Sequence, residues 1–337
     1  MSSMIIPSQQ LNPKWSKLAV EQVPIRKGFG QGLLLAAEAD PRVVGLCADL
    51  TESTQMHLFR EKFPARFFEL GVAEQNLAAT ASGLAAMGKI PFISSYATFS
   101  PGRNWEQIRT TICYNNQPVK IAGSHAGVSV GPDGGSHQAL EDIAITRVLP
   151  RLVVVVPADA LEAKKATLAL AKTAGPAYLR LAREATPIIT TDASPFHLGK
   201  ANLLRDTERL DVAIIACGTL VYQALQAAEA LAHEAEPIRV AVLNVHTIKP
   251  LDRDAIVNIA HHAKAIVTAE EHQRIGGLGG AVAELLSTNY PVPIEFVGVN
   301  DQFGQSGAPM ELLAHYGLDV TAIKAAVKKV LQRKNRR

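Results

Sequence analysis

The stretch Phe67–Asn76, FFELGVAEQN, joins a short apolar run to a helical pattern through a glycine turn. The helical stretch that follows, Asn76–Gly88 (NLAATASGLAAMG), consists almost wholly of small and apolar residues, which predicts that it is buried. Glu74 stands at the start of this helix, where a buried carboxylate without a partner is unfavourable. A bound molecule is one candidate partner. The alternative is a structural carboxylate that the helix dipole stabilises.

Around this stretch, short apolar runs alternate with longer helical patterns. The run Leu152–Val156, LVVVV, is apolar without alternation, as is typical of a parallel strand covered on both faces. The regular alternation of strands and helices predicts an open α/β sheet. Strands are expected at Val43–Ala48, Arg66–Leu70, Ile90–Ser95, Val119–Ala122, Leu152–Val156 and Ala177–Leu181, and helices near Gln75–Met87, Trp105–Tyr114, Leu140–Val148 and Ala160–Ala174.

The segment Thr186–Asp211 interrupts the rhythm, because it is rich in Thr, Pro, Asp and charged residues. Strands and helices are expected again at Asp211–Ala216, Tyr222–Ala232, Arg239–Leu243, Ala265–Ala269, from Leu278, at Ile294–Val297 and at Val320–Leu331. A chain of 337 residues suits two domains. We predict an N-terminal arm (1–20), a first open α/β domain (21–190), a linker (191–210) and a smaller α/β domain (211–337).

The net charge of +3 is spread along the chain, and only Lys328–Arg337 forms a basic run. We interpret this run as a frayed, solvated terminus. No basic stripe is interleaved with aromatic residues, so nucleic-acid binding is not expected. No run is long enough to span a bilayer, and the N-terminus lacks the pattern of a signal peptide.

The three cysteines, Cys47, Cys113 and Cys217, lie far apart in the sequence. Cys47 and Cys217 fall in apolar, strand-like runs, and the three spacings match neither a metal site nor a disulfide framework. This usage indicates a reducing compartment, and a cytoplasmic location is expected.

A second cluster, Ser124–Asp142 (SHAGVSVGPDGGSHQALED), contains His125, Asp133 and His137 in a glycine-rich loop. It follows the strand pattern PVKIAG, and ligands bind at this carboxyl edge of open α/β sheets. Histidines near neutral pKa suit proton transfer to and from hydroxyl groups. A surface loop with incidental histidines is the alternative. No further Cys or His stands at ligand spacing, so no metal ligand is expected on this chain.

Several motifs in this order resemble the C-terminal half of transketolase: GVAEQN, SYATF, GSHAGVSVGPDGGSHQALEDIA, LRLAREATP, CGTLVYQALQAAEAL, VLNVHTIKPLD, EEHQRIGGLGGAVAELL and GVNDQFGQSGAPMELLAHYGL. Together they cover essentially the whole chain. It resembles the separately encoded C-terminal subunit of a split transketolase. The resemblance implies a pyrimidine-binding domain at 21–190 and a transketolase C-terminal domain at 211–337, and the transfer of a two-carbon ketol unit between sugars.

The resemblance implies a role for four residues at the cofactor. Glu74 would hydrogen-bond N1′ of the aminopyrimidine of thiamine diphosphate. Phe99 would pack against the pyrimidine ring and Tyr96 would line the same pocket, although ordinary core packing remains open for both. Asp49 matches a family aspartate at the cofactor and substrate end of this domain.

The resemblance also implies a substrate site. Arg26 and Arg183 match two phosphate-binding arginines, Ser53 matches a residue that contacts the acceptor phosphate, and Arg180 is a second candidate beside Arg183. His125 and His137 would bind the C1 and carbonyl oxygens of the donor and relay protons. Asp133 would hydrogen-bond the C2 or C3 hydroxyl.

Nothing in this chain resembles the GDG…N motif that binds Mg²⁺ and the diphosphate in the N-terminal half of the family. The resemblance therefore implies that the chain is inactive alone. It would work with an N-terminal, diphosphate-binding subunit that supplies the metal ligands, as an α2β2 heterotetramer.

Three alternatives stay open. A deoxyxylulose-phosphate synthase-like chain and the β subunit of a 2-oxo acid dehydrogenase share the GxAEQ element and the KPLD region. A non-catalytic subunit with a decayed site is the third. The sugar is also open: a general pentose phosphate substrate and a branched or sulfonated ketose both fit an anionic tail.

Overall fold

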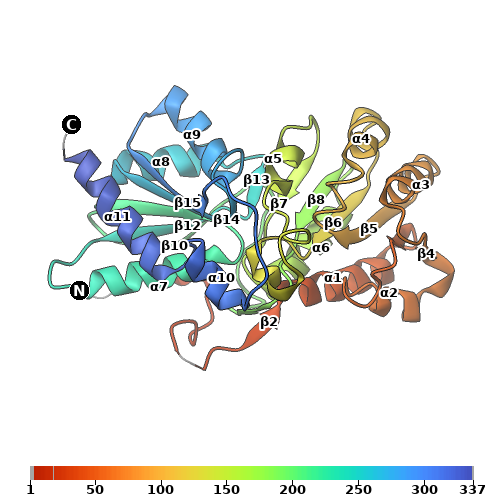
Figure 1. Ribbon diagram of the computed structural model, residues 1–337, viewed down its shortest axis with the longest axis horizontal. Helices are drawn as coiled ribbons and strands as arrows, with labels where there is room; N and C mark the ends of the chain where they lie inside the picture. Colours follow the sequence, from red (N-terminus) through yellow and green to blue (C-terminus); the bar gives the residue numbers. More distant parts are fainter. Residues whose placement is uncertain (1–3, 18, 336–337) are drawn as a thin grey trace.

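The structure is a computed structural model that describes residues 4–17 and 19–335, and it contains two α/β domains side by side (Figure 1). The first sheet has the strand order β13-β7-β8-β6-β5-β3-β4, and all its strands except β13 run parallel. Its strands are β3 (Val43–Cys47), β4 (Phe67–Glu69), β5 (Ile90–Tyr96), β6 (Lys120–Ser124), β7 (Val153–Val155), β8 (Ala177–Arg180) and β13 (Thr247–Lys249). The six strands predicted for this domain are confirmed.

Helices cover both faces of the first sheet, which is why its strands are apolar without alternation. One face carries α1 (Ile25–Ala39), α2 (His57–Lys62) and α6 (Ala160–Ala171). The other carries α3 (Glu74–Ala86), α4 (Trp105–Gln107), the π-helical segment η3 (Ile108–Tyr114) and α5 (Asp142–Arg147). The four predicted helices are confirmed, and α1 and α2 were not predicted.

Helix α1 contains three glycines, which lower helix propensity. One of them, Gly28, lies where α1 approaches α6 most closely, because a Cβ there would fall 1.8 Å from the carbonyl oxygen of Ala160. The absence of a side chain at Gly28 therefore allows α1 and α6 to pack closely.

The prediction that Asn76–Gly88 is buried is half right. Leu77, Ala78 and Ala81 of α3 are buried, but Asn76, Ala79, Gly83 and the following Met87 are exposed.

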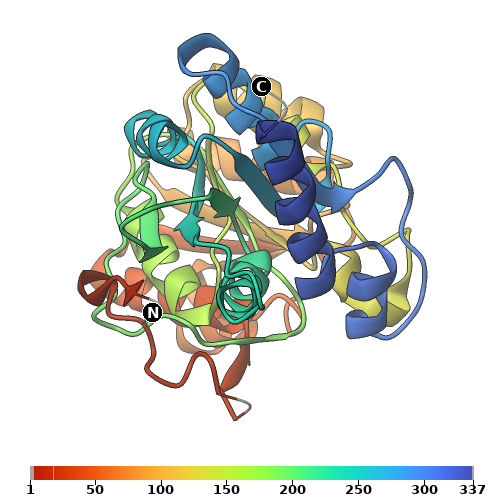
Figure 2. The same cartoon turned by 90° about the vertical axis from the view of Figure 1, so that its left-hand side faces the viewer.

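The second sheet has the order β1-β10-β12-β11-β14-β15, in which β11, β12, β14 and β15 are parallel. Its strands are β1 (Met4–Ile5), β10 (Asn202–Asp206), β11 (Val212–Ala216), β12 (Val240–Asn244), β14 (Ile266–Gln273) and β15 (Ile294–Val299). Its helices are α7 (Leu220–Ala232), α8 (Arg253–Ala263), α9 (Leu278–Asn289), α10 (Pro309–His315) and α11 (Val320–Lys334). Figure 2 shows α11, in dark blue, beside α7.

The segment predicted as a linker, 191–210, contains β10, which pairs antiparallel with β12 and β1. Leu204 and the whole side chain of Arg205 are buried there, so a strand with a polar sequence enters the second sheet. The arm predicted at 1–20 adds β1 to the same sheet and buries Trp15 in its core. A further small pair, β2 (Gln22–Pro24) with β9 (Ala185–Pro187), precedes α1.

One hydrophobic core runs through both domains. It joins the face of the first sheet under α3 and α5 to the face of the second sheet under α8 and α9. The strand β13, from the second half of the chain, pairs with β7 and extends the first sheet. The two domains are thus fused through shared apolar packing.

The prediction that Lys328–Arg337 is a frayed terminus is wrong as far as Lys334, because α11 continues to that residue. Its lysines are paired: Lys328 with Glu234, and Lys329 with Glu295. Arg336 and Arg337 lie outside the described residues. Cys47 and Cys217 are buried, as predicted, and Cys113 is buried as well; all three are free thiols. Among the described residues, no helix has the length and apolar character needed to cross a membrane.

Candidate active site

The predicted site residues gather at the carboxyl ends of four adjacent strands, β3, β5, β6 and β8. Asp49 follows β3, Tyr96 ends β5, His125 follows β6 and Arg183 follows β8. Parallel strands bring their carboxyl ends to one edge, so residues far apart in sequence meet there.

Glu74 is the first residue of α3, and its side chain is only 1% exposed. Its Oε2 accepts a hydrogen bond from Arg103 Nη1 at 2.8 Å, whereas Oε1 is buried and has no partner among the described residues. Arg103 itself is half exposed and lies over the ring of Phe99, 4.8 Å from the centroid. The sequence interpretation of Glu74 as an unpaired carboxylate is therefore wrong for one oxygen and right for the other.

Four aromatic rings form the wall beside Glu74. Tyr96 stacks on His125 with centroids 3.8 Å apart, and Phe99 lies nearly parallel to Tyr96 at 6.2 Å. His137 meets Phe99 edge to face at 5.4 Å. The two predicted aromatics and the two predicted histidines thus contact one another, although 41 residues separate Tyr96 from His137 in the sequence.

His125 sits in a left-handed backbone conformation, with φ of 56°, and is buried. Its Nε2 lies 3.2 Å from Arg26 Nη1, and its Nδ1 lies 2.8 Å from Ser124 Oγ. Arginine can only donate, so Nε2 accepts and the proton of the neutral ring resides on Nδ1. Burial, together with the charges of Arg26 and Arg183, lowers the pKa of His125 to about 3. This histidine is neutral at physiological pH.

The three residues predicted for an anionic group lie around the same loop. Arg26, near the start of α1, donates from Nη1 to the carbonyl of Ser53 at 2.7 Å. Arg183 donates from Nη1 to the carbonyl of Val130 at 2.6 Å and lies 3.9 Å from Asp133. Burial, and then the charge of the neighbouring Arg183, lower the pKa of Arg26.

Asp49 is exposed and has φ of 59°. Its N–H donates to Glu69 Oε1 at 2.7 Å, and Thr51 Oγ1 donates to Glu69 Oε2 at 2.7 Å. Glu69, at the end of β4, thus holds the loop that carries Asp49 and Ser53. Sequence reasoning did not identify Glu69, although it stands inside the FFELG stretch.

The loop that carries Asp133 and His137 is braced by the second domain. Gln138 donates from Nε2 to the carbonyls of Gly131 and Gln305. A Cβ at Gly135 would lie 2.4 Å from the carbonyl oxygen of Gly304, so these two backbones touch. The C-terminal domain therefore shapes the site without supplying any of the predicted site residues.

Arg180, the second candidate for a phosphate ligand, is not available for that role. Its Nε donates to Asp142 at 2.8 Å, and its Nη2 donates to the carbonyls of Ala139 and Glu271. It is buried between the two domains, so it serves the domain junction.

The residues present fit the pyrimidine half of thiamine diphosphate. A buried carboxylate with one unsatisfied oxygen can take a hydrogen bond from a ring nitrogen, and Phe99 offers an aromatic face beside it. Within the described ranges, no group of three or more His, Cys, Asp or Glu could hold a metal ion. Arg103 was missed by sequence reasoning; its only signal is that it follows Phe99 by four residues.

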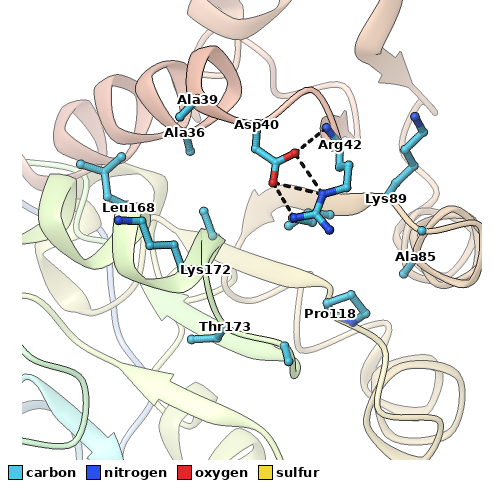
Figure 3. A pocket seen from close by; sticks show the side chains of 14 residues that line it. Ala36, Ala39, Asp40, Arg42, Ala85, Lys89, Pro118, Leu168, Lys172 and Thr173 are labelled. Carbon is cyan, nitrogen blue, oxygen red and sulfur yellow. Dashed lines mark hydrogen bonds and ion pairs between the residues drawn. The ribbon is translucent and has the colours of Figure 1, made fainter.

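The site should not be confused with a cavity of 660 Å³ at the opposite edge of the first sheet (Figure 3). That cavity lies where α1, α3 and α6 end, and the ion pair of Asp40 and Arg42 stands on its wall. Lys89 and Lys172 also line it, as cations commonly do near helix C-termini. None of the predicted site residues reaches it.

Known protein families match most of the chain. Residues 21–188 match the family model of the transketolase pyrimidine-binding domain, and residues 199–323 match that of the transketolase C-terminal domain. A protein of Methanocaldococcus jannaschii described as a transketolase C-terminal section is 43% identical, over 89% of this chain and 93% of its own length. The chain belongs to the transketolase family. It corresponds to the C-terminal part of that family, with two α/β domains as predicted.

Two further relatives are informative. The 6-deoxy-6-sulfo-D-fructose transketolase subunit of Clostridium sp. is 40% identical, over 95% of this chain and 98% of its own length. A solved structure described as a split-gene transketolase, inactive beta4 tetramer, is 45% identical with a TM-score of 0.85, over 93% of this chain and 99% of that chain. Transketolases are thiamine diphosphate-dependent transferases, and the chain is similar to family members encoded as separate subunits.

Proposed function

We propose that this chain is the C-terminal subunit of a two-subunit transketolase that transfers a two-carbon ketol unit from an anionic ketose to an aldose phosphate. The observation that carries the proposal is the grouping of Glu74, the aromatic rings and the two histidines at one sheet edge. Thiamine diphosphate, when bound, supplies the nucleophilic carbon and the electron sink for cleaving the bond beside a ketose carbonyl.

Glu74 would bind N1′ of the aminopyrimidine and share a proton with it. Burial strengthens such a hydrogen bond, since little water competes for the carboxylate. Phe99 and Tyr96 would hold the ring in place through apolar contact. These three residues orient the cofactor from one side only.

His125, His137 and Asp133 would bind the oxygens of the donor sugar. Because His125 is neutral, it would act by donating or accepting a hydrogen bond and would not carry a positive charge. His137 is half-buried and meets Phe99, the ring that would pack against the pyrimidine.

Arg26, Ser53 and Arg183 would hold the anionic tail of the substrate. The forked donors of the two arginines suit phosphate and sulfonate equally, so the tail chemistry alone leaves both classes of sugar open. Asp49, at the end of β3, would line the same entrance.

The partner would be an N-terminal, diphosphate-binding subunit that supplies the ligands of Mg²⁺, in an α2β2 heterotetramer. The side of the first domain that carries Glu74 leaves large apolar side chains in solvent: Val72 is 69% exposed, Met87 80% and Tyr114 81%. Apolar side chains that a partner covers no longer contact water, so these positions are candidates for the interface. Relatives named as subunits support a separate partner.

The test is co-expression with the N-terminal subunit encoded nearest to this chain. Ketol transfer would be assayed with thiamine diphosphate, Mg²⁺, and phosphorylated or sulfonated ketoses. We expect turnover only when both chains are present. Robust turnover by this chain alone, or an inactive purified complex with every donor, would refute the proposal.

A further inference from the structure

Arg103 makes the two contacts that the proposed function assigns to the aminopyrimidine. Its planar guanidinium donates to Glu74 Oε2 at 2.8 Å. The same group lies over the ring of Phe99, 4.8 Å from the centroid. Hydrogen bonding to a buried carboxylate and stacking on an aromatic face are the contacts of a flat, protonated heterocycle.

The side chain of Arg103 can leave without disturbing the fold. It is half exposed, whereas the neighbouring Asn104 is fully buried. Asn104 Nδ2 donates to the carbonyl of Glu74 at 3.0 Å and to Ser100 Oγ at 3.1 Å, which fixes the backbone on both sides of the site. Only the arginine side chain would have to move.

We propose that Arg103 acts as a built-in substitute for the aminopyrimidine, occupying Glu74 and Phe99 in the uncombined chain and leaving when the cofactor binds. The inference rests on the proposed function. It adds a residue that competes for the site and therefore sets the affinity for the cofactor. It also explains how a buried carboxylate is kept compensated before the partner subunit completes the site.

Geometry favours displacement over coexistence. The guanidinium of Arg103 lies over the ring of Phe99, on which the aminopyrimidine would also pack, and it occupies one oxygen of Glu74. A flat ring placed on the same aromatic face needs the space that the guanidinium fills. Arg103 would therefore turn toward solvent when the cofactor binds.

The experiment measures binding of thiamine, which carries the pyrimidine but not the diphosphate, to the full-length chain alone by isothermal titration calorimetry. If the free site is competent in about one molecule in ten, Arg103→Met binds thiamine about tenfold more tightly than wild type. Arg103→Lys keeps a cation for Glu74 but lacks the planar group, so its gain should be smaller. Arg109→Met, an exposed arginine on the same side, should match wild type.

Equal or weaker binding by Arg103→Met, or no binding by any variant, overturns the inference. Adding Glu74→Gln to Arg103→Met should abolish the gain, and a gain that persists would place thiamine elsewhere and also overturn it. Melting temperatures of each variant confirm that the proteins are folded. The function itself is judged by the two-chain assay: an active wild-type complex without an Arg103 effect on binding refutes only this inference.

Discussion

Glu74 and Glu271 are both buried carboxylates, but they are compensated in opposite ways. At the domain junction, Glu271 receives the N–H of Ser129 at 2.7 Å on one oxygen and the hydroxyl of Thr219 at 2.8 Å on the other. At the open edge, Glu74 has one half-exposed arginine and one oxygen that no described residue contacts by a hydrogen bond. The junction uses rigid neutral donors on both oxygens, whereas the site uses a single removable cation.

The difference separates stability from function. A buried polar group with all partners fixed contributes to a unique packing, while one left incomplete has a cost that a ligand can remove. Glu162 belongs with Glu271: its oxygens accept from the N–H of Ala158 and from Asn244 Nδ2 across the domain junction. Substitutions at these carboxylates should therefore change different measurable properties.

The largest effect is expected from Glu74→Gln in the two-chain complex. The amide cannot share a proton with N1′, so kcat should fall roughly a thousandfold, within the range for losing acid–base catalysis. The melting temperature of the chain should change little, since one oxygen already lacks a partner. The control is Glu106→Gln, an exposed glutamate seven residues before Cys113, which should retain full activity. Full activity of Glu74→Gln would remove Glu74 from the mechanism.

Glu271→Ala should show the converse pattern, with a loss of about 3 kcal/mol in unfolding free energy. The N–H of Ser129 would be left buried without an acceptor. Urea unfolding followed by circular dichroism measures the change. Glu271→Gln retains an oxygen for Ser129 and should lose much less. A large drop in turnover with unchanged stability would contradict the assignment of Glu271 to the junction.

Most of the first sheet could be predicted because each strand is a continuous apolar run bounded by turns. Strand β10 could not, because it ends in Arg205 and Asp206, and only the fold shows that Arg205 is buried. Helix α1 was missed because glycines that allow contact with α6 resemble loop residues. Propensity was overridden by tertiary packing in both cases.

The residues of the candidate site were predicted from the sequence, but the hydrogen bonds between them were not. The gathering of Tyr96, Phe99, His125 and His137 follows from parallel strands that end at one edge. The contact of Arg103 with Glu74 spans 29 residues and depends on how the loop before α4 turns. A hydrogen bond of that kind has no periodic signal in the sequence.

Gly127→Ala would test how tightly the junction holds Glu271. Gly127 has φ of 90°, and a Cβ there would lie 2.3 Å from Glu271 Oε1. The backbone strain and the displaced carboxylate should together cost about 2 kcal/mol. In a Glu271→Ala background the cost should shrink, because the clash is gone. Equal costs of Gly127→Ala in both backgrounds would show that backbone strain alone causes the loss of stability.

Gly83→Ala, with nothing within 4 Å of the new Cβ, should stabilise the isolated chain slightly.

The last comparison concerns pH and Glu162. Burial, and then the charge of Asp159, raise the pKa of Glu162 to about 8 from an ordinary value of 4.5. The folded chain thus binds this proton more tightly than the unfolded chain. The resulting stabilisation is complete below pH 4.5 and is lost as the pH rises through 8, at a slope of about 1 kcal/mol per pH unit in between.

Glu162→Gln isolates this effect, because the amide stays neutral at every pH. Its oxygen can still accept from Ala158, and its NH2 can donate to Asn244 Oδ1, which is buried and has no partner in the part of the chain that the structure describes. Buried His125 and Lys120, whose pKa values are lowered to about 3 and about 7, titrate in both proteins and cancel in the difference. Between pH 6 and pH 8 the wild type should lose unfolding free energy relative to Glu162→Gln in urea titrations. A constant difference would mean that Glu162 does not change its protonation between pH 6 and pH 8, and would contradict a raised pKa at the junction.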